Sequence, residues 1–228
     1  MRSPSAPLTA TFATGGIGLV VLLGVLVSTG ISDPADAAVI QVVRAPDLSV
    51  LLAPLRQITE LGSTWAVTAV AILTLLLAVA IGPWRHGLIG ALTIVIASAL
   101  NATIKLAVAR ERPALLEPLI SERGFSFPSG HSALGMVAYG ILAVVITRSR
   151  LPRVARVTLV VLLFVLVLLI GISRVWLGAH YPTDVLAGWI AGAVIVGAYA
   201  FMSRDVPRDP SEVAVDSEPP PVSLPPDG

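Results

Sequence analysis

The chain contains no cysteine, one lysine and three histidines among its 228 residues. The absence of cysteine excludes disulfide bonds, thiol catalysis, and zinc or iron–sulfur sites with cysteine ligands. Charged residues make up only 13% of the sequence, about half of their usual share in a soluble domain. The net charge of +1 gives no support to nucleic-acid binding, because domains that bind nucleic acids carry a marked basic excess.

Apolar residues dominate the sequence instead. They make up 55% of it, and the mean hydropathy is +0.88. A helix needs about 20 mostly apolar residues to cross a bilayer. Six charge-free stretches meet this length or come close to it: Ser3–Ser32, Leu61–Trp84, Gly87–Ile104, Ser132–Thr147, Val157–Ser173 and Val185–Ser203. The sequence therefore predicts an all-α fold, an integral membrane bundle of six transmembrane helices.

An even number of spans places both termini on one side of the membrane. The positive-inside rule assigns that side to the cytoplasm, by eight basic residues against seven. The loop between the fourth and fifth spans is the strongest single indication, because it holds four arginines: Arg148, Arg150, Arg153 and Arg156. We expect a multi-pass protein of the plasma (inner) membrane with cytoplasmic termini.

Three clusters of polar residues lie on the side opposite the termini, and ionisable residues beside spans are functional candidates by default. The first, Lys105 to Pro113, follows the third span. Lys105 and Arg112 are seven residues apart, which would place them on one face of a helix that ends at Pro113. Two such cations could clamp a phosphate, although basic residues at span ends also snorkel toward the interface.

The second cluster is the Phe127–His131 segment at the start of the fourth span. Ser129 and Gly130 are typical of a helix start, where free backbone N–H groups bind anions. A phosphate bound there would lie beside His131, whose imidazole can donate a proton. The alternative interpretation is a capping serine next to an interfacial histidine.

The third cluster runs from Ser173 to Asp184, between the last two spans. His180 and Asp184 are four residues apart, so the carboxylate can hold one ring nitrogen and raise the basicity of the other. A histidine nucleophile or base requires that arrangement, and Arg174 adds a third cation. The alternative is a capping aspartate next to an interfacial histidine.

In order and spacing, the three clusters resemble the motifs of the type 2 phosphatidic acid phosphatase family, which is related in its site to vanadium-dependent haloperoxidases. The family pattern is K-x6-R-P, then P-S-G-H, then S-R-x5-H-x3-D. The chain matches it at Lys105–Pro113, Pro128–His131 and Ser173–Asp184. The resemblance implies a metal-independent phosphatase of membrane lipid phosphates that uses no cofactor.

The resemblance also implies a role for each matched residue. His180 attacks phosphorus and forms a phosphohistidine, Asp184 orients His180, and His131 protonates the leaving oxygen and then activates water. The phosphate oxygens would be held by Lys105, Arg112, Ser129, Gly130 and Arg174. Three cations and the N–H groups of a helix start agree with this, because phosphoryl transfer depends on positioning and charge stabilisation.

We therefore expect a lipid phosphate phosphatase with its site at the extracytoplasmic face, and the lipid bilayer and a lipid phosphate as its partners. Polyprenyl diphosphate is the first expected substrate, and phosphatidylglycerol phosphate and phosphatidate stay open. A phosphotransferase that passes the phosphoryl group to a lipid or sugar is the alternative. A non-catalytic protein that binds or transports lipids is a further one.

The regions outside the motifs complete the expected organisation. Residues 1–60 hold the first span and a loop with short interfacial helices, residues 61–203 the five-helix catalytic core, and residues 204–228 a disordered Pro-rich cytoplasmic tail. An A-x-A pattern at Ala35–Ala37 leaves signal-peptide cleavage open. Small residues in the last span predict close packing, within the bundle or in a homo-oligomer. Charges between the first two motifs are interpreted as solvated: Arg110, Glu111, Glu117, Glu122 and Arg123.

Overall fold

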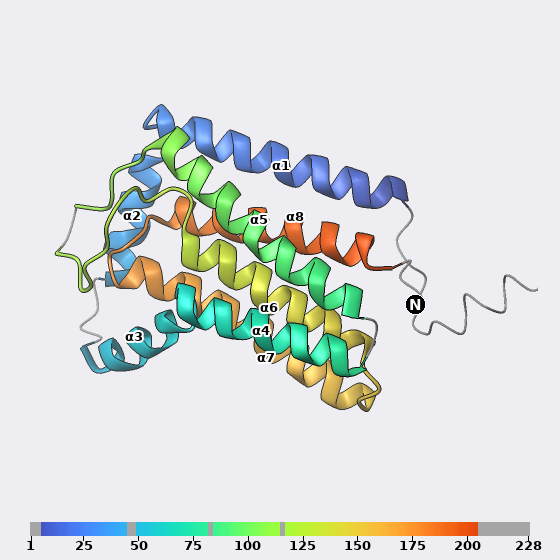
Figure 1. Cartoon of the computed structure of the whole chain (residues 1–228). Coiled ribbons are helices and arrows are strands. Elements are labelled where there is room, and N and C mark those ends of the chain that lie inside the picture. The colour runs from blue at the N-terminus through green and yellow to red at the C-terminus, as the bar shows by residue number, and fades with distance from the viewer. Residues whose placement is uncertain (1–5, 45–48, 82–83, 115–116, 205–228) are drawn as a thin grey trace, which may run out of the picture.

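The computed structural model is a bundle of long helices with short helices across one end (Figure 1). It describes residues 6–44, 49–81, 84–114 and 117–204. The long helices are α1 (Ala6–Ser28), α4 (Thr64–Ile81), α5 (Trp84–Val108), α6 (Gly130–Arg148), α7 (Arg153–Trp176) and α8 (Pro182–Met202). The short ones are α2 (Asp33–Arg44), the 3-10 helix η1 (Ser49–Leu51) and α3 (Leu52–Glu60). The prediction of an all-α membrane bundle is confirmed, and the predicted tail lies outside the described residues.

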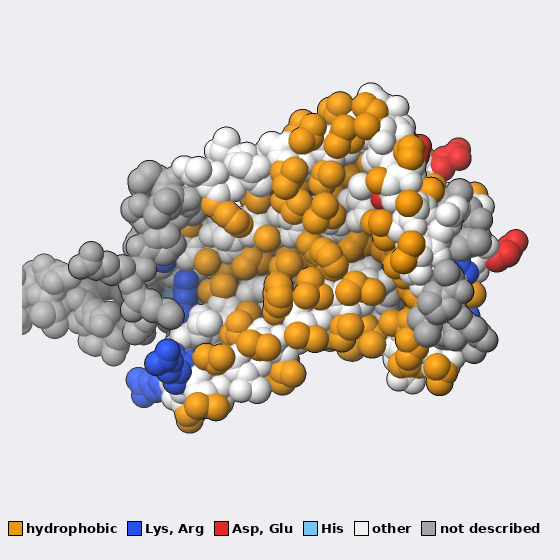
Figure 2. Space-filling view, turned by 180° about the vertical axis from the view of Figure 1, so that it is seen from behind, with side chains coloured by type: hydrophobic (Ala, Val, Ile, Leu, Met, Phe, Trp, Pro, Cys, Tyr) orange, Lys and Arg blue, Asp and Glu red, His pale blue; other side chains and the backbone are white. Residues whose placement is uncertain are grey.

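Within the described residues, five helices are long and apolar enough to cross a membrane, namely α1, α5, α6, α7 and α8. Helix α4 qualifies together with α3, from which it is bent by 49°. The six predicted spans correspond to these five helices and the bent pair. Figure 2 shows a broad apolar surface between the two ends of the bundle, where the charged side chains gather. The protein is a multi-pass membrane protein.

Helix α6 is the centre of the bundle. Half of the residues in its apolar 18-residue stretch are buried, compared with 17% in the corresponding stretches of α1 and α7. Three of its side chains, Val137, Ala138 and Ile141, are buried in the main core. The buried partners from the surrounding helices are Val67 of α4, Ile94 and Ala97 of α5, and Tyr199 of α8. The helix that begins with the second motif is therefore held on several sides.

Helix α8 approaches α6 closely at two of its glycines. A Cβ atom at Gly188 would lie 2.8 Å from the carbonyl oxygen of Ser129, and one at Gly192 would lie 2.8 Å from that of Ala133. Neither position accepts a side chain without moving backbone. The small residues of the last span thus serve packing inside the bundle at these two positions.

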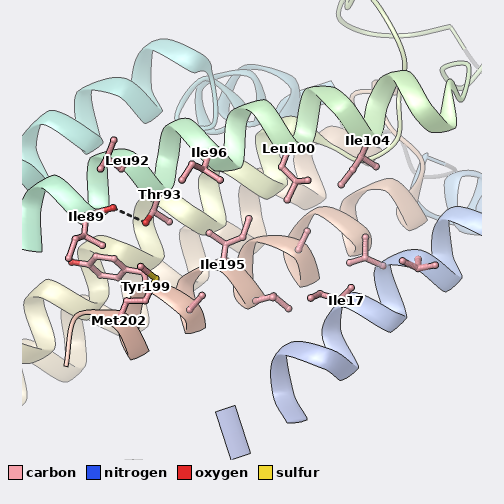
Figure 3. A pocket seen from close by; sticks show the side chains of 15 residues that line it. Ile17, Ile89, Leu92, Thr93, Ile96, Leu100, Ile104, Ile195, Tyr199 and Met202 are labelled. Atoms are coloured by element: carbon pink, nitrogen blue, oxygen red, sulfur yellow. Dashed lines mark hydrogen bonds between the residues drawn. The ribbon is translucent and has the colours of Figure 1, made fainter. Parts of the chain in front are cut away.

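An apolar groove of about 640 Å³ opens between α1, α5 and α8 (Figure 3). Its lining includes Ile17, Leu100 and Ile104. Beyond Ile104, residues Leu23 and Val27 of α1 pack in one cluster with α5. Helix α1 therefore meets α5 between the groove and the polar end of the bundle, and the lining of the groove is almost entirely apolar.

The α6–α8 contact predicts unequal effects of two identical substitutions. Gly192→Ala should destabilise the protein by about 1–3 kcal/mol, because the new methyl group overpacks a close helix contact. Gly18→Ala in α1 is the matched control, since a Cβ there meets nothing within 4 Å and alanine favours a helix. Thermal unfolding in detergent measures both. Equal melting temperatures for the two variants would contradict the assigned packing.

Candidate active site

The first motif does not lie on one continuous helix, contrary to the sequence-based expectation. Helix α5 ends at Val108, and the next residue, Ala109, has a φ of +51°. This left-handed conformation turns the chain away from the helix axis, so Arg112 lies in the following loop, not two helical turns above Lys105. The two cations still approach the same region, because each binds the segment before the second motif.

Lys105 and Arg112 both donate hydrogen bonds to that segment, at residues 123–126. Lys105 Nζ donates to the carbonyl oxygens of Phe125 at 2.7 Å and Ser126 at 3.2 Å. Arg112 donates to the carbonyl oxygens of Arg123 and Gly124, both at 3.0 Å, and to that of Ala179 at 2.8 Å. Burial lowers the pKa of Arg112. Arg112 thereby joins the loop before the second motif to the turn that carries the third.

The second motif forms the start of α6, as its serine and glycine indicated. Ser129 is the N-cap residue, and its hydroxyl accepts from the N–H of Ser132 at 3.4 Å and from its hydroxyl at 3.0 Å. The Ser129 N–H donates to the carbonyl oxygen of Asp184 at 3.0 Å. Because these groups of Ser129 already have partners, the N–H groups of Gly130 and His131 are the anion donors that this helix start offers.

His131 is the second residue of α6 and lies against the bend between α3 and α4. A Cβ atom at Gly62, in that bend, would lie 3.0 Å from His131 Cδ2. The side chain is half-buried and within electrostatic reach of Arg174, Glu122 and His180. The bent pair of helices therefore covers His131 from one side.

A helix-ending turn positions His180. Gly178 has a φ of +77°, which only glycine adopts without strain. The N–H groups of Ala179 and His180 both donate to the carbonyl oxygen of Arg174, at 3.0 and 3.2 Å. The last turn of α7 thus presents His180 to the start of α8.

His180 and Asp184 form a buried pair. His180 Nδ1 lies 3.4 Å from Asp184 Oδ2, and Nε2 lies 3.3 Å from Arg112 Nη1. Burial lowers the pKa of His180 to about 4, although the carboxylate of Asp184 opposes the shift. The expected gain in basicity is outweighed by desolvation, and His180 is neutral at pH 7.

Arg174 is almost fully buried and faces Glu122, which the sequence did not single out as a partner. Its Nη1 donates to Thr59 Oγ1 at 2.8 Å, and its Nη2 forms an ion pair with Glu122. Burial alone would raise the pKa of Glu122, but Arg174 outweighs it, and the net shift is downward. Arg174 Nε is buried without a hydrogen-bond partner among the described residues, so it has a donor left for an anion.

Arg110 was also interpreted as a solvated loop charge, and that expectation is wrong. Its side chain is 7% exposed and forms ion pairs with Asp33, Asp36 and Asp184, each at 2.8 Å. Burial works to lower the pKa of Arg110, but the carboxylates of Asp184 and Asp36 outweigh it and raise the pKa. The expectation rested on neighbouring charges in the sequence, whereas the ion-pair partners come from segments far away along the chain.

The motif residues therefore converge at one end of the bundle. A cavity of about 320 Å³ adjoins them and is lined by the side chains or backbone of Arg112, Pro118, Ser121, Glu122, Gly178 and Ala179 among others. A neutral histidine paired with a carboxylate, a second histidine, three cations and a helix start have the charge and the donors that binding of an anionic group requires. These parts suit nucleophilic displacement at phosphorus.

Comparisons with known proteins agree with this geometry. The model of the PAP2 superfamily matches residues 86–207, just over half of the chain. The protein belongs to the PAP2 superfamily, which confirms the resemblance seen in the motifs.

Two curated relatives carry phosphatase names. The chain is 39% identical over 98 residues to a phosphatidylglycerophosphatase B of Bacillus subtilis, covering 42% of this chain and 47% of the relative. It is 30% identical over 118 residues to an undecaprenyl-diphosphatase of Sulfolobus acidocaldarius, covering 49% and 52%. The matched segments thus span about half the length of these relatives.

A solved structure is similar over most of the chain. It is the crystal structure of a transmembrane PAP2-type phosphatidylglycerolphosphate phosphatase from Bacillus subtilis. The TM-score is 0.78 at 26% identity, and the match covers 86% of this chain and 98% of that one. Because it covers 86% of the chain, this similarity extends beyond residues 86–207, which the family model matches.

The buried His180–Asp184 pair predicts an unusual titration. His180 should stay neutral as the pH falls from 8 to 5 and become protonated only near pH 4, because its lowered pKa shifts protonation below the ordinary value of about 6.5. Histidine-selective isotope labelling and NMR in detergent can follow this, since the chain has three histidines. The His180→Ala variant assigns the signal. A midpoint near pH 6.5 for His180 would contradict the buried, desolvated environment.

Proposed function

We propose that the protein hydrolyses the phosphate or diphosphate group of a membrane lipid through a phosphohistidine on His180. The observation that carries this proposal is the convergence of the three motifs around a buried His180–Asp184 pair at one end of a membrane bundle. Membership of the PAP2 superfamily and the phosphatase names of the relatives support the same reaction class.

The first step forms a covalent bond between His180 and phosphorus. Because Nδ1 faces the carboxylate of Asp184, it carries the ring proton, and the lone pair is on Nε2. As the bond from Nε2 to phosphorus forms, the bond from phosphorus to the lipid oxygen breaks. His131 donates a proton to that leaving oxygen, and Asp184 stabilises the positive charge that develops on His180.

The second step releases phosphate. A water molecule attacks phosphorus and gives one proton to His131, while the bond from phosphorus to Nε2 breaks. Both histidines return to their starting protonation states, and inorganic phosphate leaves. The balance of atoms and protons requires water alone, without a redox partner or a further acid.

The phosphate oxygens are stabilised by fixed positive groups. We assign this role to Lys105, Arg112, Arg174 and the N–H group of Gly130, with Ser129 shaping the start of α6. Arg112 lies 3.3 Å from the attacking nitrogen, which suits a cation that stabilises charge in the transition state. Arg174 Nε has no hydrogen-bond partner in the part of the chain that the structure describes, and Nη2 forms an ion pair with Glu122, so a bound phosphate competes with Glu122 for this side chain.

The substrate is a lipid whose phosphate reaches the headgroup level. The activities for which the relatives are named favour two classes, phosphatidylglycerol phosphate and a polyprenyl diphosphate. Phosphatidate stays a third candidate. All three present a terminal phosphate on an apolar anchor, which matches a polar site at the end of an apolar bundle.

Phosphate release by the purified protein tests this proposal. Detergent-purified protein should release phosphate from at least one of the three lipids in the presence of a chelator. His180→Ala should lower kcat by at least about 10³-fold, because the covalent route is lost. His86→Ala is the matched control, because His86 lies at the opposite end of α5. Full activity of His180→Ala would refute the nucleophile, and phosphate transfer only to an added lipid or sugar would indicate a phosphotransferase.

We also propose that the site faces the extracytoplasmic side of the plasma membrane, with the termini in the cytoplasm. The count of basic residues was nearly balanced, but their environments differ. At the site end, Arg110 and Arg174 are held in ion pairs, and Arg44, Arg56 and Arg112 donate to backbone carbonyls. At the other end, Arg148 and Arg156 also donate to backbone carbonyls, and Arg85, Arg150 and Arg153 are exposed. The four arginines of the short loop at 148–156 therefore support a cytoplasmic assignment by the positive-inside rule.

The absence of cysteine makes this orientation directly testable. Single variants Arg123→Cys and Arg150→Cys replace exposed arginines at the two ends. A membrane-impermeant maleimide added to intact cells should label Arg123→Cys and spare Arg150→Cys until the membrane is opened. The reverse labelling pattern would place the site in the cytoplasm.

A further inference from the structure

A buried acidic residue outside the family motifs, Asp36, contacts the start of α8. Asp36 lies in the first turn of α2 and is 1% exposed. Its Oδ1 accepts from the N–H of Thr183 at 3.0 Å, and its Oδ2 accepts from the Thr183 hydroxyl at 2.7 Å. Thr183 immediately precedes Asp184. A carboxylate buried this deeply is costly unless it is paired, and its cation partner is Arg110.

Arg110 joins Asp36 to Asp184 through the two arms of its guanidinium. Nη2 donates to Asp36 Oδ2 at 2.8 Å, and Nη1 donates to Asp184 Oδ1 at 2.8 Å. The group also lies over the ring of Tyr181, with Cζ 3.8 Å from its centroid. A planar guanidinium held by bonds at its edge and a ring on its face has one orientation.

This orientation fixes the carboxylate of Asp184. Oδ2 accepts from the N–H of Tyr181 at 2.9 Å and faces His180, while Oδ1 is bound by Arg110. The bond from Arg110 therefore prevents the carboxylate plane from rotating, and Oδ2 stays directed at His180 Nδ1. Without Arg110, the described residues leave Asp184 with no arginine or lysine in an ion pair.

We propose that Arg110 and Asp36 are positioning residues for the Asp184–His180 pair, which makes helix α2 a part of the catalytic apparatus. This inference rests on the proposed roles of His180 and Asp184. Helix α2 lies outside residues 86–207, which the family model covers. Neither Arg110 nor Asp36 touches the phosphate in this scheme, and both act through Asp184.

A purely structural role for Asp36 is the competing explanation. Helix α2 is also anchored by Ile40, which is 1% exposed and packs with Val175 and Val185. If Asp36 served only to attach α2, weakening the Ile40 contact would lower kcat as much as removing the Asp36 charge. Ile40→Val is therefore the matched variant, because it loosens the same helix without touching the ion pairs.

Steady-state kinetics of five variants tests the proposal, with melting temperatures measured alongside. Arg110→Gln should lower kcat on the order of 10²-fold and Asp36→Asn about 10-fold, with KM changed by less than about threefold, since misplaced catalytic groups cost turnover more than binding. The kcat of Arg110→Lys should stay as low as that of Arg110→Gln, because one ammonium cannot bridge both carboxylates. Ile40→Val and Glu111→Gln should keep the wild-type kcat. Glu111 is exposed and next to Arg110, so its variant removes a neighbouring carboxylate.

A double variant tests whether Arg110 and Asp36 affect kcat through the same contact or independently of each other. Arg110→Gln with Asp36→Asn should be no slower than Arg110→Gln alone, because Asp36 acts through Arg110. Wild-type kcat for folded Arg110→Gln and Asp36→Asn, rescue by Arg110→Lys, or an equal loss in Ile40→Val would each overturn the proposal. Full activity of His180→Ala would instead refute the proposed function, so the two failures are distinguishable.

Discussion

The polar end of the bundle depends on the hydrogen bonds and the ion pair that the buried Asp184 forms. Its side chain accepts from the N–H of Tyr181 and from Arg110, and it faces His180. Its backbone carbonyl accepts from the N–H of Ser129. One residue thereby sets the start of α8, the start of α6 and the orientation of His180. An unpaired charge at this depth would cost several kcal/mol, so its partners and their supporting helices are constrained together.

The same requirement for paired charges explains why so many polar groups can gather in an apolar protein. At the site end, Arg110 and Arg174 form ion pairs, whereas Arg44, Arg56 and Arg112 donate to carbonyl oxygens, and Arg174 and Glu122 neutralise each other. The short helices make this arrangement possible, because α3 supplies Thr59 to Arg174 and α2 supplies Asp36 to Arg110. The N-terminal segment thus does more than anchor the chain in the bilayer.

The sequence predicted what depends on composition and local spacing, and missed what depends on distant contacts. Long apolar stretches identified the spans, and the Ser129–Gly130 pair identified the start of α6. The end of α5 was placed too late, because Ala109 is a helix-favouring residue that gives no local signal for a left-handed turn. Arg110 was misjudged because Asp36 and Asp184 are both 74 residues away along the chain, and no local pattern reports such a contact.

Helix length then sets the depth at which the chemistry occurs. Helices of 19 to 25 residues are roughly 28–38 Å long, and the hydrocarbon core of a bilayer is about 30 Å thick. The end of α5, the start of α6 and the start of α8 consequently lie near the headgroup level, and each carries one of the motifs. Under the proposed function, a lipid would leave its chains in the bilayer while its phosphate enters the site. A protein that acts on such a headgroup therefore needs no enclosed cavity for the hydrocarbon chains, which agrees with an apolar groove separated from the polar site.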